Sequence, residues 1–70
     1  MSQVKVLSRL VWQIPIGWGF EEEDIEKYSS VLDVQMGSEY YTVTFVNDLE
    51  LDQLAEELSE YGLFVTASTH

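Results

Sequence analysis

The chain has 70 residues, the length of one small domain, so we expect a single domain over residues 1–70. It carries 13 acidic residues against 3 basic ones, a formal net charge of -10, which argues against binding nucleic acid or an anionic membrane through phosphate groups. Hydrophobic residues make up 46% of the chain, as in globular proteins, and the absence of cysteine excludes disulfides and thiolate metal sites, so we expect a cytoplasmic protein.

The first predicted element is a long strand over residues 4–14, because Val4, Val6 and Trp12 alternate onto one face. Ser8 is the polar break in this face, and if the chain turns there, the segment forms two strands instead of one. Pro15 ends the strand, since proline has no N–H to donate to a sheet. Residues 16–20 are predicted to form a loop.

A short helix is predicted over residues 21–30. Ile25, Tyr28 and Leu32 follow helical spacing, which would direct them toward a sheet. The acidic residues of its first turn complement the positive end of the helix dipole. Residues 32–36 then alternate between apolar and polar side chains, which predicts a strand.

A β-hairpin is predicted at Gly37 and Ser38. A two-residue connection suits a type II′ turn, because glycine accepts the positive φ that the first central position requires. The strand that follows, residues 40–46, is rich in β-branched and aromatic residues.

Asn47 or Asp48 is predicted to cap a second helix, with Glu50 placed three residues after Asn47 as in a capping box. A stripe of apolar residues runs from there to Tyr61. Gly62 is predicted to end the helix in a left-handed backbone conformation.

Residues 63–68 alternate again and predict a last strand, so the element order is β-α-β-β-α-β. This order is typical of the ferredoxin-like fold, an α+β fold with a four-stranded antiparallel sheet and two helices on one face. Right-handed crossovers give the strand order 4-1-3-2. The alternative is an α+β fold led by a β-hairpin, if the first strand breaks at Ser8.

The acidic residues gather in and beside the two predicted helices, which hold only Lys27 as a basic residue. The first group is Glu21, Glu22, Glu23, Asp24 and Glu26, and the second is Asp48, Glu50, Asp52, Glu56, Glu57 and Glu60. If both helices cover one side of the sheet, their outward faces form one negative surface. The open side of the sheet is expected to carry Lys5, Leu7, Arg9, Val11, Tyr40, Thr42, Thr44 and Phe64.

The sequence gives little support for a catalytic, metal-binding or nucleic-acid-binding site. The histidine of the chain is His70, and we find no nucleophile elbow, zinc-protease motif or phosphate loop, so we expect no enzyme and no cofactor. The segment 48–52 has the spacing of the first calcium ligands of an EF-hand, but Gln53 replaces the required glycine and Ser59 the final glutamate. Tyr40 and Phe64 lack the motif of an RNA-recognition sheet.

The leading functional hypothesis is a non-enzymatic inhibitor that occupies a basic, nucleic-acid-binding site of a partner protein. Carboxylates would stand in for phosphates, and two aromatic residues of the loop would anchor the contact. The predicted partner-binding residues are Trp18, Phe20, Glu22, Glu23, Glu26, Glu50, Asp52, Glu56, Glu57 and Glu60. In charge and size alone, the chain resembles phage-encoded inhibitors of the anti-restriction and anti-CRISPR type.

Two simpler interpretations stay open. The aromatic rings of Trp18 and Phe20 would also fit a role as cover for the small core, and an acidic helix face can serve solubility alone. The alternative function is a regulatory or assembly module that forms a homodimer through its open sheet face.

Overall fold

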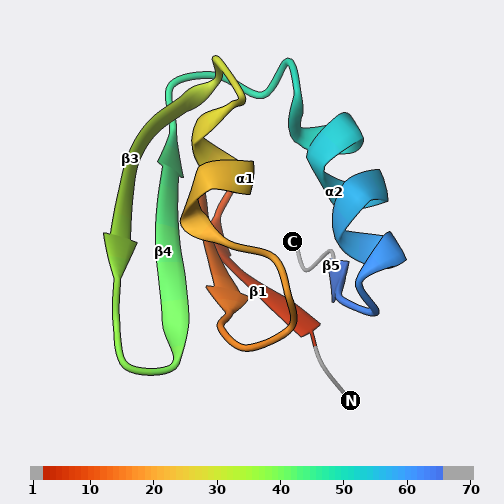
Figure 1. Ribbon diagram of the computed structural model, residues 1–70. Helices are drawn as coiled ribbons and strands as arrows, with labels where there is room; N and C mark the ends of the chain where they lie inside the picture. The colour runs from red at the N-terminus through yellow and green to blue at the C-terminus, as the bar shows by residue number, and fades with distance from the viewer. Residues whose placement is uncertain (1–2, 66–70) are drawn as a thin grey trace.

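The computed structural model describes residues 3–65 and has an α+β fold, with one mixed five-stranded sheet and two helices. Figure 1 shows α1 in front of the strands and α2 to their right, above β5. The elements in chain order are β1 (Gln3–Ser8), β2 (Val11–Pro15), α1 (Glu22–Glu26), β3 (Val31–Met36), β4 (Tyr40–Phe45), α2 (Leu51–Glu60) and β5 (Phe64–Val65). The strand order is β3-β4-β2-β1-β5.

The expected four-stranded, fully antiparallel ferredoxin-like sheet is wrong, because the first strand is a hairpin. The chain turns at Arg9 and Leu10, and β1 pairs antiparallel with β2. The turn reverses the chain direction, so β1 runs parallel to β5 at the sheet edge. An unbroken strand over residues 4–14 would extend about 36 Å, whereas the longest dimension of the molecule is 27 Å. The break at Ser8 keeps both halves paired within the sheet.

The core lies between the sheet and the helices. Trp12 and Ile14 of β2 alternate inward, and the Trp12 ring meets Phe45 of β4 edge to face at 5.3 Å. Both helices contribute to the same cluster, through Ile25 of α1 and Leu54 of α2. The sheet therefore buries one face beneath the helices and leaves the other uncovered.

Helix α1 is much shorter than the predicted segment 21–30, and β3 begins with a bulge. After α1 the chain continues in turns, in which Tyr28 N donates to Ile25 O and Val31 N to Tyr28 O. Leu32 lies in the bulge between Val31 and Asp33 and is 65% exposed, so its expected place on the sheet-facing stripe is wrong.

The predicted hairpin between β3 and β4 is present, but its turn differs from type II′. Met36 pairs with Tyr41, and Gly37 N donates to Tyr40 O at 2.8 Å, so Ser38 and Glu39 are the central residues of the turn. The turn therefore lies one residue later than predicted. Gly37 precedes its central positions and does not adopt a positive φ.

Helix α2 starts later than predicted and ends as predicted. Asn47 does not form a capping box with Glu50, since both side chains bind Ser30 instead. At the other end Gly62 has φ +86°, and Leu63 N donates to Leu58 O at 3.0 Å, as in a Schellman motif. The predicted last strand is present over Phe64–Val65, and its remainder, like His70, lies outside the described residues.

Candidate acidic binding face

Glu57 of α2 connects the two helices. Its carboxylate accepts a hydrogen bond from the hydroxyl of Tyr28 and lies 3.0 Å from Nζ of Lys27, both in the turn after α1. Burial, together with the bond to Glu57, raises the pKa of Tyr28, and the bond to Glu57 raises the pKa of Lys27. Glu57 is therefore occupied within the fold and has less capacity to bind a partner than the sequence predicts.

Glu50 makes a second connection at the start of α2. Its Oε1 accepts from Ser30 N at 2.8 Å and from Ser29 Oγ at 3.3 Å. The backbone N–H of Ser30 is the main reason that the pKa of Glu50 lies below its ordinary value. Ser30 Oγ in turn donates to Asn47 Oδ1 at 2.7 Å. Glu50 thus holds the segment after α1 against α2.

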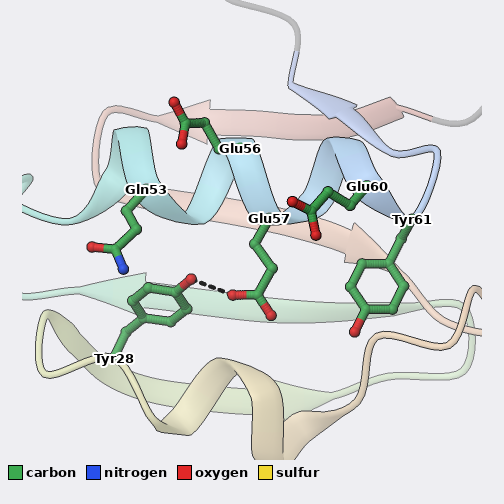
Figure 2. A pocket seen from close by; sticks show the side chains of 6 residues that line it. All are labelled: Tyr28, Gln53, Glu56, Glu57, Glu60 and Tyr61. Carbon is green, nitrogen blue, oxygen red and sulfur yellow. Dashed lines mark hydrogen bonds between the residues drawn. The ribbon is translucent and has the colours of Figure 1, made fainter.

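Between these elements lies an open groove of about 420 Å³. Figure 2 looks into it, with α2 above and α1 with its following turn below. Its lining consists of Tyr28, Gln53, Glu56, Glu57, Glu60 and Tyr61. Glu57 and Glu60 extend toward the space between the two tyrosine rings, whereas Glu56 points away from Tyr28. The groove therefore combines aromatic walls with carboxylates.

The predicted carboxylates divide into two sets. Exposed on the helices are Glu23, Glu26, Asp52, Glu56 and Glu60, which we call the acidic face; Glu22, Glu50 and Glu57 are half-buried. Within α1 the neighbouring carboxyl group of Glu26 raises the pKa of Glu22. Only Glu56, Glu57 and Glu60 of the predicted set reach the groove.

The two predicted aromatic anchors, Trp18 and Phe20, differ in exposure. Phe20 is 1% exposed and packs edge to face against Tyr61 at 5.3 Å, so the prediction that it anchors a partner at the surface is wrong. The loop directs the Phe20 ring inward, where it forms part of the hydrophobic core. Trp18 stays 45% exposed and lies beside Gly62 at the end of α2.

Sequence reasoning missed three groove residues. The sequence pattern places Tyr28 and Tyr61 on apolar stripes and gives no functional signal for Gln53. A signal was present for Tyr28, because a tyrosine on a buried stripe needs a partner for its hydroxyl, and the second helix offers carboxylates. The position of Gln53 depends on the groove between the helices, which local sequence does not specify.

The uncovered face of the sheet differs from the helical side. Pairing between strands places Lys5 opposite Gln13, Gln13 opposite Thr42, and Val11 opposite Thr44, all facing away from the helices. Tyr40 and Phe64 lie on the same face, as predicted from the sequence. Arg9 lies in the β1–β2 turn and Leu7 in a bulge of β1.

Comparisons with protein-family models, with curated proteins and with solved structures found no match to this chain. Within residues 3–65, no three acidic or histidine side chains are grouped in a way that could hold a metal ion. The helices of this described part are too short or too polar to cross a lipid bilayer.

Proposed function

We propose that this protein is a non-enzymatic inhibitor that binds, through its acidic face, a basic surface on a cytoplasmic nucleic-acid-processing protein. The observation that carries the proposal is the exposure of Glu23, Glu26, Asp52, Glu56 and Glu60 on the two helices, beside a groove walled by two tyrosines. Lys27, in the turn after α1, is a basic residue beside this face, and it is already paired with Glu57.

The groove suits an arginine or lysine side chain of the partner. Glu60 supplies an exposed carboxylate for a charge-assisted hydrogen bond, and the half-buried ring of Tyr61 supplies a surface along which the aliphatic stem can lie. The remaining carboxylates of the acidic face would meet basic residues that otherwise contact phosphates. The concentrated negative field speeds the encounter, so the association rate falls as salt is added.

The contact residues that we propose are fewer than those expected from the sequence. Glu50 and Glu57 stay engaged with Ser30 and Tyr28, and Phe20 is buried. Trp18 remains the exposed aromatic residue of the loop and the proposed apolar anchor at the rim. We propose no role for the phosphates of nucleic acid, which the net charge of -10 repels.

The test is affinity capture from a lysate of the source cell or its host, with the immobilised protein as bait and mass spectrometry of the bound fraction. Parallel samples receive duplex DNA as a competitor. The proposal predicts a nucleic-acid-binding protein that is retained without DNA and released by it. Capture that DNA leaves unchanged would contradict phosphate mimicry, and the absence of any captured basic protein would contradict the binding role.

A further inference from the structure

The uncovered face of the sheet carries mostly uncharged side chains. Two neighbouring rows cross it, one made of Lys5, Gln13, Thr42 and Gln35, the other of Ser8, Val11, Thr44 and Asp33. Gln13, Val11 and both threonines are half-buried although no helix covers them. Phe64 extends the face on β5 and is 60% exposed.

Negative charge is nearly absent from this face. Asp33 is its acidic residue and Lys5 its basic one. Every other acidic residue belongs to the helices or their flanking segments, except Glu39 in the β3–β4 loop. Two copies of a chain with net charge -10 repel each other along their helical sides. Approach through the sheet faces keeps the helical carboxylates of the two copies farther apart, so the repulsion is weaker there.

We propose that a second copy of this chain docks on the uncovered sheet face, so that two sheets stack with their helices outward. This interaction is separate from the proposed inhibitor function, because it leaves the acidic face and the groove free. It would present two acidic faces on opposite sides of one particle.

The strand order provides a geometry for the pair. β2 is the central strand of β3-β4-β2-β1-β5, so a two-fold axis parallel to the strands places β2 over its own copy. The same axis places β1 across β4 of the other copy and β5 across β3. Lys5 of each copy then lies over the side of the sheet that holds Asp33, and Phe64 is covered. The face is therefore complementary to itself in charge.

The size of the face predicts a weak dimer. The five strands hold 6, 5, 6, 6 and 2 residues. At about 3.3 Å per residue and about 4.8 Å between strands, their footprint is on the order of 400 Å² per copy. Two such footprints total about 800 Å², which is below the standard size of specific interfaces and typical of weak, transient ones. We therefore expect dissociation on dilution, and association that strengthens with salt because salt screens the repulsion between the copies.

The test is sedimentation equilibrium of the full chain between about 10 µM and 1 mM, at low and high NaCl, for the wild type and two variants with the same substitution. Gln13→Lys puts two like charges across the proposed axis, whereas Gln53→Lys adds the same charge on α2. Both lower the net negative charge. If repulsion alone governed association, both would strengthen it; the proposal expects Gln53→Lys to strengthen it and Gln13→Lys to weaken it about tenfold.

If Gln13→Lys does not fold, a second measurement tests the proposal: the isotopically labelled wild type is diluted, and its amide chemical shifts are recorded by NMR at each concentration. The proposal expects concentration-dependent shifts at Val11, Gln13 and Thr42. A monomer at 1 mM in high salt would overturn it. Shifts confined to the helices or to the outer edge of β3, or an equal strengthening by both variants, would overturn it as well.

Discussion

At the scale of single residues, the bond between Tyr28 and Glu57 is the contact that most directly couples the two halves of the helical side. Tyr28 is 6% exposed, and its hydroxyl donates to a carboxylate on α2. We expect Tyr28→Phe to lower the free energy of unfolding by about 1–2 kcal/mol, since a hydrogen bond to a charged acceptor is lost. Urea denaturation measures the change.

Tyr61→Phe is the matched control for this variant, because no hydrogen bond of the Tyr61 hydroxyl occurs within residues 3–65 and its ring lies in the same groove. Tyr61→Phe should lower the free energy of unfolding by less than about 0.5 kcal/mol. Equal losses in the two variants would show that the rings, and not the bond to Glu57, stabilise the groove.

Glu50 gives the fold a defined dependence on pH. Its folded pKa lies below the ordinary value of 4.5, because it accepts hydrogen bonds from Ser30 and Ser29. This contribution to stability is fully present above pH 4.5 and is lost as pH falls through the folded pKa, since the unfolded chain takes up the proton first. The half-buried position keeps the effect modest.

Glu50→Gln removes that proton uptake, so the variant should lose less stability than the wild type between pH 6 and pH 3. Urea denaturation at several pH values measures this, with Glu56→Gln as a control on the exposed side of α2. A gap between wild type and Glu50→Gln that is as wide at pH 3 as at pH 6 would exclude the charge of Glu50 as its cause.

At the scale of elements, the sequence predicts the end of an element correctly where a single residue type determines it. Gly62 ends α2 because its φ of +86° suits glycine. We expect Gly62→Ala to cost about 1–2 kcal/mol, which denaturation would measure. Its added Cβ would meet the Trp18 ring only at 3.5 Å, so strain in the backbone is the cause. Gly62→Asn should lose less, because asparagine tolerates this region; an equal loss would point to steric conflict instead.

Elements whose limits depend on distant partners were predicted less well. The apolar alternation of residues 4–14 is interrupted at Ser8 but resumes in the same phase at Leu10, so the local sequence fits one long strand as well as two short ones. Phe45 N of β4 donates to Leu10 O, a pairing that exists only after the sheet has formed. Likewise, Glu50 has the spacing of a capping residue, but Ser30 competes for its carboxylate across 20 positions of the chain.

At the scale of the whole molecule, charge is sorted by side. The helical side carries nearly all the carboxylates, and the opposite face of the sheet carries uncharged side chains with Lys5 and Asp33. The sequence predicted an acidic side because helix stripes show which residues point outward. It did not predict the groove, nor the hydrogen bonds that Glu50 and Glu57 accept from Ser30 and Tyr28, since these depend on how close α1 and its following turn lie to α2. The proposed function therefore rests on placement of charge rather than its total.

The most direct test of that central claim compares two variants of equal net charge in the capture experiment. Glu56→Gln with Glu60→Gln removes two carboxylates from the acidic face, and Asp33→Asn with Glu39→Gln removes two from the strands and their loop. We predict that the first variant retains at least tenfold less of the DNA-displaced partner than the wild type, and that the second retains it almost fully. Equal retention by the two variants would contradict a binding role for the acidic face.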